Sequence, residues 1–188
     1  MLVRSDNGTP LFGIVGWKQS GKTTLTTALI AHFTKLGFRV ASLKHAHHAF
    51  SIDDGPTDSA RHRASGATQV AVASAKRWAI ITETPRPAGG SETDSGHTPN
   101  PLVLANRLDP ADILLVEGFK QANIPKLEVR RREAVQQTPL CDTVPGVVAI
   151  ASDDLAPGVS GPTHFDTNDI AAIADFIATH CELTRSQT

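Results

Sequence analysis

The spacing of apolar residues predicts a strand, a turn, a helix and a second strand at the start of the chain. Residues 11–15 are an apolar run, and a glycine-containing turn follows at 16–21. From Lys22 to Leu36, apolar residues recur at helical spacing, at Leu25, Ala28, Leu29, Phe33 and Leu36. Gly37 is placed to end this helix, because glycine adopts the left-handed conformation of a helix end without strain. With a second strand at 38–43, the pattern indicates a right-handed crossover between parallel strands.

Apolar runs and helical patterns alternate along the rest of the chain. The strongest signal for a buried strand is Asp112–Glu117, where the residues between two carboxylates are all apolar. A last helix is predicted to start near Thr167, with Asp169 in its first turn, and to bury Ile170, Ile173, Phe176 and Ile177. The other predicted elements are strands at 68–73, 78–82, 126–130 and 147–151, and short helices at 58–65 and 101–108.

This alternation predicts a three-layer α/β fold, with a mostly parallel central sheet and helices on both of its faces. Pro, Gly, Ser and Thr dominate residues 83–101, a composition typical of a mobile surface loop. A length of 188 residues favours a single domain that spans residues 1–188 and includes this loop.

Charge and composition exclude several classes of protein. Eighteen Lys and Arg against nineteen Asp and Glu give a net charge of −1, which argues against a nucleic-acid binder that relies on bulk positive charge. No stretch approaches the roughly 18 apolar residues of a membrane span, and the N-terminus has no secretory pattern. Cys141 and Cys181 are expected to be free thiols. We therefore expect a soluble, cytoplasmic protein without nucleic-acid or membrane partners.

The strongest motif in the chain is the phosphate-binding pattern G-x-x-x-x-G-K-[ST], which residues 16–23 match without a gap. Its glycines let successive backbone N–H groups point at a polyphosphate, and the following helix adds the positive end of its dipole. Lys22 is expected to reach the β- and γ-phosphates, and Thr23 to bind Mg²⁺ through its hydroxyl. The residues predicted to hold the nucleotide are Gly16, Trp17, Lys18, Gln19, Ser20, Gly21, Lys22, Thr23 and Thr24.

Two carboxylates are candidates for catalysis and for the Mg²⁺ site. Glu117 ends the strand at 112–117, an arrangement that places an acid beside Mg²⁺ and the γ-phosphate, although a solvated glutamate is the alternative. Asp53 closes the segment 44–53, which leaves the same sheet edge as residues 16–23, and is a candidate for outer-sphere contact to Mg²⁺ or the γ-phosphate. Both carboxylates join Lys22 in the predicted catalytic set and Thr23 in the predicted Mg²⁺ set.

The same segment carries His45, His47 and His48. Together with Asp53 they could bind a transition metal, because imidazole suits Zn, Ni and Cu. The segment has no cysteine, and two of its histidines are adjacent. Two alternatives are therefore favoured over a high-affinity structural metal site: a solvated polar loop, or histidines that hydrogen-bond the nucleotide or a partner.

Two segments compete for recognition of the base. Residues 106–109 match the guanine-recognition pattern N-[KR]-x-D, but they precede the strand of Glu117, whereas a base-reading loop follows a later strand. Asp153 and Asp154 follow the strand at 147–151, where such a loop belongs. A carboxylate there would accept from guanine N1–H and N2–H₂, which adenine lacks, so Asp153 is the predicted base contact. An ordinary Asp-rich turn is the alternative.

A local basic stretch interrupts the otherwise balanced charge. It consists of Lys120, Lys126, Arg130, Arg131 and Arg132. An acidic partner, a phosphorylated ligand and a solvated edge strand are equally compatible with it.

Beyond the phosphate loop, several groups of residues follow one another in an order typical of one known family. They are Thr23-Thr24-Leu25, Lys44-His-x-His-His-x-Phe50-x-Ile-Asp53, Asp58-Ser59 with Arg61, Gly66-Ala67, Leu115-Val-Glu-Gly-Phe-Lys120 and Pro125-Lys126-Leu-Glu-Val-Arg130. With these motifs, between Leu11 and Ala151, the chain resembles the molybdopterin-guanine dinucleotide biosynthesis adaptor (MobB) family of P-loop GTPases. At 54–59 the chain reads DGPTDS where the family has a Pro-Gly-Lys-Asp-Ser run, so this chain lacks the lysine of that run.

The resemblance implies a homodimer that binds GTP with Mg²⁺ and has weak GTPase activity. It also implies a role as an adaptor, which assists the guanylyltransferase that attaches GMP to molybdopterin and helps to hand on the finished cofactor. Two other functions fit the phosphate loop. One is a small-molecule kinase with residues 83–101 as its lid, although that loop has only Arg86 to clamp a phosphate. The other is a GTP-dependent metal-insertion chaperone that holds its metal on His45, His47 and His48.

Overall fold

The computed structural model describes residues 1–46, 51–83, 100–136, 138–154 and 161–184. They form two compact units, which we describe separately. The first unit comprises Met1–His45 and Pro99–Thr188, and the second comprises Ala46–Thr98. The single domain expected over 1–188 stays a prediction, and most of the expected loop at 83–101 lies outside the described residues.

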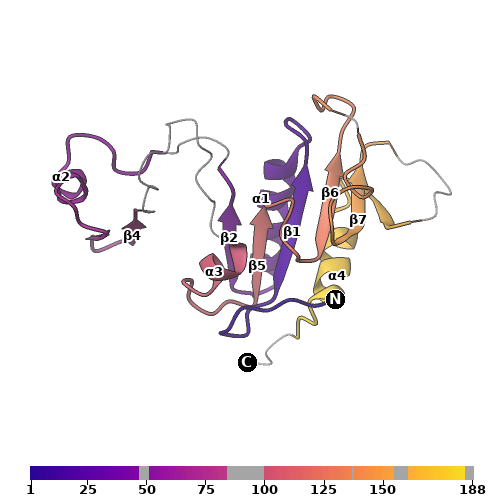
Figure 1. The fold of residues 1–188 in the computed structure, drawn as a ribbon. Helices are drawn as coiled ribbons and strands as arrows, with labels where there is room; N and C mark the ends of the chain where they lie inside the picture. Colours follow the sequence, from indigo (N-terminus) through magenta and orange to yellow (C-terminus); the bar gives the residue numbers. More distant parts are fainter. Residues whose placement is uncertain (47–50, 84–99, 137, 155–160, 185–188) are drawn as a thin grey trace. The chain divides into compact units, whose positions relative to one another are not determined.

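A six-stranded, fully parallel sheet forms the centre of the first unit (Figure 1). Its strands run in the order β2, β5, β1, β6, β7, β8, so β5 separates two strands that are consecutive in sequence, β1 and β2. Their bounds are β1 (Leu11–Gly16), β2 (Val40–Lys44), β5 (Ile113–Glu117), β6 (Lys126–Arg130), β7 (Val147–Ser152) and β8 (Thr163–Asp166). The predicted α/β fold with a parallel central sheet is confirmed.

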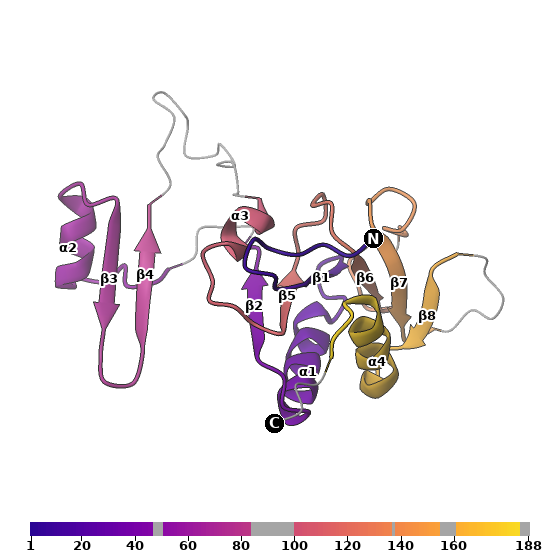
Figure 2. The ribbon, with the colours of Figure 1, turned by 90° about the horizontal axis from the view of Figure 1, so that it is seen from below.

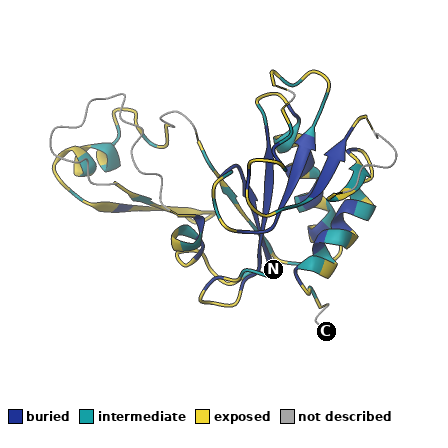
Figure 3. Cartoon of the chain, turned by 45° about the vertical axis from the view of Figure 1, so that its right-hand side comes forward, coloured by how far each residue is buried: buried dark blue, intermediate teal, exposed yellow. Residues whose placement is uncertain are grey.

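Helices cover both faces of this sheet, as predicted. Helices α1 (Lys22–Lys35) and α4 (Ile170–His180) lie on one face, and the short α3 (Pro101–Ala105) lies on the other (Figure 2). Side chains alternate across a strand, so neighbouring residues of β1 enter different cores. Phe12 packs with the α1 and α4 side, whereas Leu11 packs with the α3 side. The strands between these layers are buried along their whole length at the centre of the sheet (Figure 3).

Three of the differences from the sequence prediction concern β8, α4 and the end of α1. Strand β8 was not expected. Helix α4 begins at Ile170 rather than near Thr167, because the Asp169 side chain accepts from Ala172 N and therefore caps the helix instead of lying in its first turn. Leu36 follows α1 and is exposed, so it does not extend the buried face of that helix. Gly37 ends the helix as expected, with a φ of +90°.

The second unit contains one helix and one hairpin. Helix α2 (Asp58–Ala64) is followed by β3 (Gln69–Ala73) and β4 (Trp78–Thr82), which pair antiparallel as a two-stranded sheet. Val70 is buried, whereas Trp78 is 64% exposed and Ile80 57% exposed. In the described part of both units, no helix is long and apolar enough to cross a membrane.

Candidate functional site

The phosphate loop, residues 16–23, joins the end of β1 to the start of α1 in a conformation that depends on glycine. Gly21 has a φ of +87°, in the left-handed region, and directly precedes Lys22, the first residue of α1. A Cβ on Gly16 would lie 2.6 Å from the carbonyl oxygen of Val129 on the neighbouring β6. The loop is therefore packed so closely against β6 that a side chain at Gly16 would displace it.

Lys22 is half-buried and directed back over the loop. Its Nζ donates to the carbonyl oxygen of Trp17 at 2.6 Å. Desolvation lowers the pKa of Lys22, nearby Glu117 opposes that shift, and the charges of Lys120 and Lys44 add to it. Several cations therefore gather at this loop, and a polyphosphate is the ligand that such a field favours.

The structure brings together Thr23 and Glu117, two of the predicted Mg²⁺ residues. Thr23 Oγ1 donates to Glu117 Oε1 at 2.8 Å, and Glu117 is only 8% exposed. Lys44, at the end of β2, has its Nζ 3.1 Å from the same carboxylate oxygen and 3.3 Å from Thr23 Oγ1. A hydroxyl and a carboxylate oxygen at one sheet edge are ligands that Mg²⁺ accepts.

The described residues between β6 and β7, 131–136 and 138–146, contact the phosphate loop from the side of β6. Val135 N donates to Lys18 O at 3.2 Å, and Trp17 Nε1 donates to Thr138 O at 2.7 Å. Arg131 lies against Gly21, where its Nε is 2.9 Å from the position that a Cβ would take. The sequence identified Arg131 only as part of a basic stretch, and no local signal placed it at the phosphate loop.

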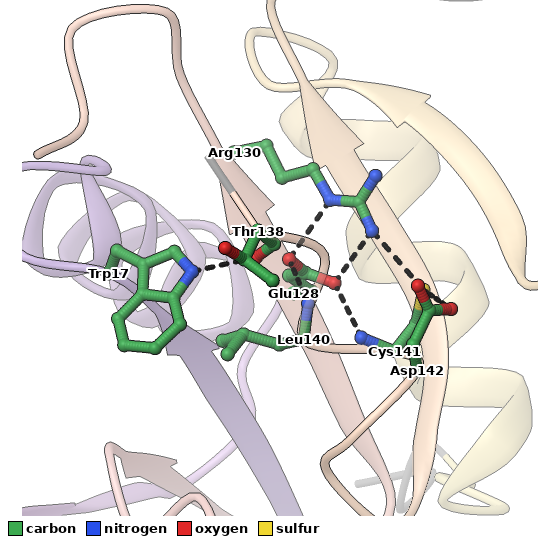
Figure 4. A network of polar contacts seen from close by, with 7 residues as sticks. All are labelled: Trp17, Glu128, Arg130, Thr138, Leu140, Cys141 and Asp142. Carbon is green, nitrogen blue, oxygen red and sulfur yellow. Dashed lines mark hydrogen bonds and ion pairs between the residues drawn. The ribbon is translucent and has the colours of Figure 1, made fainter. Parts of the chain in front are cut away.

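One buried carboxylate fastens this segment to the sheet (Figure 4). Glu128 of β6 is 1% exposed and accepts from the backbone N–H groups of Leu140 and Cys141 at 2.9 Å and 3.0 Å. The Arg130 guanidinium donates to both of its carboxylate oxygens at 2.9 Å, and this contact raises the pKa of Arg130. Glu128 therefore holds the segment that contacts Trp17, a role the sequence did not reveal.

The predicted base-reading residues follow β7, at the same edge of the sheet. Asp154 forms an ion pair with Arg132, at 3.1 Å, and this contact raises the pKa of Arg132. The charge of Asp153 also raises the pKa of Arg132, by less than the Asp154 contact does. Strand β8 pairs with β7 so that Ser152 lies opposite Asp166, which adds the end of β8 to this side of the site. That the base contacts Asp153 stays a prediction.

The competing segment at 106–109 lies elsewhere. It precedes β5 and so belongs to the opposite edge of the parallel sheet. Asn106 Oδ1 accepts from Asp6 N at 2.9 Å, and Asn106 Nδ2 donates to Asp6 Oδ2 at 2.6 Å. These contacts attach the N-terminal segment to the end of α3, which accounts for Asn106 without a nucleotide.

Asp53 belongs to the second unit. Its φ is +58°, and hydrogen bonds with the Ser59 and Thr57 hydroxyls lower the pKa of its carboxyl. Arg63 donates to its carbonyl oxygen at 2.8 Å. The role of Asp53 toward Mg²⁺ stays a prediction.

The three histidines are only partly described. His45 lies in the first unit, where its N–H donates to Glu117 O at 2.9 Å, and His47 and His48 lie outside the described residues. Within the described ranges, no group of three or more His, Cys, Asp or Glu side chains is arranged to hold a metal ion.

Comparison with known proteins identifies consistent relatives. The model of the family "Molybdopterin guanine dinucleotide synthesis protein B" matches residues 11–153. A molybdopterin-guanine dinucleotide biosynthesis adapter protein from Haemophilus influenzae is 39% identical over 178 residues, which cover 94% of this chain and 92% of the relative. The Escherichia coli protein of the same description is 36% identical over 170 residues, 89% of this chain and 91% of that one.

Solved structures agree with this fold. A crystal structure of molybdopterin-guanine biosynthesis protein B, 25% identical, matches with a TM-score of 0.65 and covers 92% of this chain and 99% of its own. A Bacillus subtilis MobB structure, 22% identical, matches with a TM-score of 0.66 over 94% of this chain and 99% of its own, and supports the fold alone.

Proposed function

Because the chain belongs to the molybdopterin guanine dinucleotide synthesis protein B family, we propose that it is an adapter in molybdenum-cofactor biosynthesis that binds Mg·GTP at its phosphate loop. The observation that carries the nucleotide site is the 2.8 Å hydrogen bond between Thr23 and Glu117, beside a loop with left-handed Gly21. Of these two residues, only Thr23 belongs to the phosphate-binding motif. The added carboxylate comes from a strand almost a hundred residues later in the chain.

Each residue of this site has a distinct proposed role. Backbone N–H groups of the loop and of the first turn of α1 hold phosphate oxygens, and Lys22 neutralises the β- and γ-phosphates. Thr23 and Glu117 supply oxygen ligands suited to Mg²⁺, which when bound would neutralise charge between these phosphates. In this structure Lys44 Nζ contacts Thr23 Oγ1 and Glu117 Oε1. When Mg²⁺ binds these two oxygens, the Lys44 side chain would turn toward the phosphates.

We expect the GTPase activity to be weak. The Glu117 carboxylate is engaged by Thr23 and Lys44, so it is held for ligand binding rather than presented to a water molecule. Asp53 stays our second candidate for orienting water. Slow turnover suits an adapter whose nucleotide regulates association with the guanylyltransferase and other proteins of the pathway.

We expect a homodimer formed through the hairpin of the second unit. The β3–β4 register places Ala71, Ala73, Trp78 and Ile80 on one face, and the last two are largely exposed. A two-stranded sheet is marginal alone. Within the described residues, neither outer edge of β3–β4 pairs with a further strand. A second copy of the hairpin presents the same apolar face and the same edges, so it is the occupant that would cover them.

Calorimetric titration with Mg·GTP, Mg·ATP and Mg·GDP tests the nucleotide proposal. We expect GTP to bind and to be preferred over ATP, and Lys22→Ala to lose binding while keeping its thermal melt. Absence of GTP binding by the wild type would overturn the site.

The pathway is tested separately, by recovery of partners from a cell extract. The chain is immobilised with and without a non-hydrolysable GTP analogue, and bound proteins are identified. We expect the guanylyltransferase of molybdenum-cofactor synthesis among them, enriched by the analogue. Transfer of labelled γ-phosphate to a small acceptor would instead favour a kinase.

A further inference from the structure

A lysine outside the phosphate-binding motif lies over the phosphate loop. Lys120 follows β5 by three residues, and its Nζ lies 3.6 Å from the centre of the Trp17 ring. Trp17 is the second residue of the loop, so Lys120 reaches the loop from the adjacent strand. Cation–π contact of this kind holds an ammonium group without neutralising its charge.

The turn that contains Lys120 has an unusual backbone conformation, which packing against His45 stabilises. Gly118 and Phe119 both have positive φ values, +88° and +52°. A Cβ on Gly118 would lie 2.9 Å from His45 Cβ, so the tight approach of His45 requires glycine. The Phe119 ring is buried and packs on the His45 ring at a centroid distance of 4.7 Å. Left-handed conformation at a non-glycine residue costs free energy and is typically found where function requires it.

Two lysines thereby approach the same residue. The Lys22 Nζ bonds to the carbonyl oxygen of Trp17, and the Lys120 Nζ lies over its ring. The lysine of this motif binds the β- and γ-phosphates, so Lys120 stands at the terminal-phosphate end of the loop. Burial lowers the pKa of Lys120, and Lys120 in turn lowers the pKa of Lys22. The two positive charges repel each other, and an anion bound between them would relieve the repulsion.

We propose that Lys120 is a second phosphate-binding lysine, which leaves the Trp17 ring to contact the terminal phosphate of GTP. This inference rests on the proposed GTP site and deepens it. A phosphate oxygen binds an ammonium more strongly than an indole face does, and a lysine has a flexible stem long enough to move between them. Lys120 thereby distinguishes the triphosphate from the diphosphate.

Affinities for GTP and GDP measured by calorimetry in matched variants test this role. In Lys120→Met we expect GTP affinity to fall roughly ten- to hundredfold and GDP affinity by less than about threefold. Lys120→Arg, which keeps the charge, should stay within about threefold of wild type for both nucleotides. Lys35→Met is the control. Lys35 is an exposed lysine at the far end of α1, and its substitution removes the same formal charge.

Trp17 gives a second readout that does not depend on affinity. The chain has two tryptophans, so Trp78→Phe leaves Trp17 as the single emitter. In that background, saturating GTP should change Trp17 emission more than saturating GDP does, because only GTP withdraws Lys120 from the ring. Adding Lys120→Gln should abolish the difference while the thermal melt stays cooperative.

The outcomes separate this inference from the GTP site itself. If wild type binds neither nucleotide, the proposed function fails and Lys120 has no phosphate to bind. If wild type binds both, and Lys120→Met weakens GTP and GDP equally or weakens neither, the GTP site stands and the role of Lys120 is overturned.

Discussion

Each of the two units of this chain is stabilised internally in a different way. Every residue of β1 and β5 is buried, and two layers of helix cover the sheet to which they belong. In the second unit, β3 and β4 expose most of their residues, and α2 has no buried residue. A chain segment that buries so little apolar surface gains little free energy from folding alone.

Polar contacts replace a core in the second unit. The Arg63 side chain is nearly buried and donates to Ile52 O at 3.2 Å, to Asp53 O at 2.8 Å and to Asp54 Oδ1 at 2.8 Å. Its Nε also lies 3.3 Å from Glu83 Oε1 and forms an ion pair with it. One guanidinium thus fixes the loop around Asp53, whereas the first unit relies on packing. Our proposals place nucleotide binding in the packed unit and self-association in the exposed one.

Lys22→Ala is the strongest test of whether nucleotide binding belongs to the first unit alone. We expect GTP affinity to fall roughly a thousandfold, about 4 kcal/mol, because charge-assisted contacts to two phosphates are lost. The dimer should persist, since Lys22 is not in the second unit. Titration calorimetry and analytical ultracentrifugation on one preparation measure both properties. Near-normal GTP affinity in a folded variant would remove the nucleotide site from the first unit.

The stability of the first unit should depend on pH through Lys126. This side chain is fully buried and donates to Ile124 O at 3.0 Å, to Pro145 O at 2.6 Å and to Ala122 O. Burial lowers its pKa from 10.5 to about 8. Between these values the unfolded chain binds more protons than the folded chain does, so the free energy of unfolding should rise with pH.

Chemical denaturation from pH 7.5 to 10.5 measures this rise in the free energy of unfolding. Lys126 should contribute up to about 3 kcal/mol of it. In Lys126→Met the slope over the same range should be shallower, whatever the absolute stability of the variant. Parallel slopes in the two proteins would mean that Lys126 titrates as in the unfolded chain.

Ile80→Asp tests the second half of the comparison. A charge on the apolar face of the hairpin should weaken dimerisation by about 2 kcal/mol or more, because an apolar side chain is no longer buried. GTP affinity per monomer should be unchanged. Thr82→Asp, on the same strand and more peripheral on the same face, is the control. A dimer of undiminished affinity would mean that another surface joins the protomers.

Asp153→Ala should reduce base selectivity within the first unit. We expect the preference for GTP over ATP, roughly 1–3 kcal/mol, to collapse while ATP affinity barely changes, since the phosphate loop contacts phosphates alone. Asp154→Ala is the matched variant, and its ion pair with Arg132 predicts a smaller loss. Competition binding in the three proteins decides between them. Loss of preference in Asp154→Ala but not in Asp153→Ala would exchange their roles.

Glu117→Gln should have the smallest effect on affinity. We expect GTP to bind within about tenfold of wild type, because the backbone groups that supply most phosphate contacts are retained. Turnover should fall, because one negative charge near the Mg²⁺ ligands is removed. Single-turnover hydrolysis at saturating GTP measures it, and an unchanged rate would return Glu117 to a structural role.

The sequence predicted elements that have a strong local pattern. Strand β1, helix α1 and strand β5 have the length and periodicity of buried elements, so their positions were identified within a residue or two. Strand β8 was missed because Phe165 is the only apolar residue among its four residues, Thr163–Asp166, and none of them is fully buried. It is ordered by pairing with β7, which is a long-range contact.

The same distinction applies to the site. Lys22 and Thr23 were identified because the motif is continuous, and Glu117 because an acid ends an apolar strand. The positions of Lys120, Arg131 and Glu128 at the phosphate loop follow from strand order, with β5 on one side of β1 and β6 on the other. Periodicity does not determine strand order, so these residues were at most assigned to a basic stretch.

The position of β5 between β1 and β2 also affects how the chain folds as it leaves the ribosome. The first two strands do not pair with each other, and each needs β5 as its neighbour. From His45 to Ile113 the ribosome adds 68 residues. At roughly 5–20 residues per second this takes about 3–14 s. During that interval the apolar strand β1 has no partner in the sheet, so the nascent chain presents a surface that chaperones recognise.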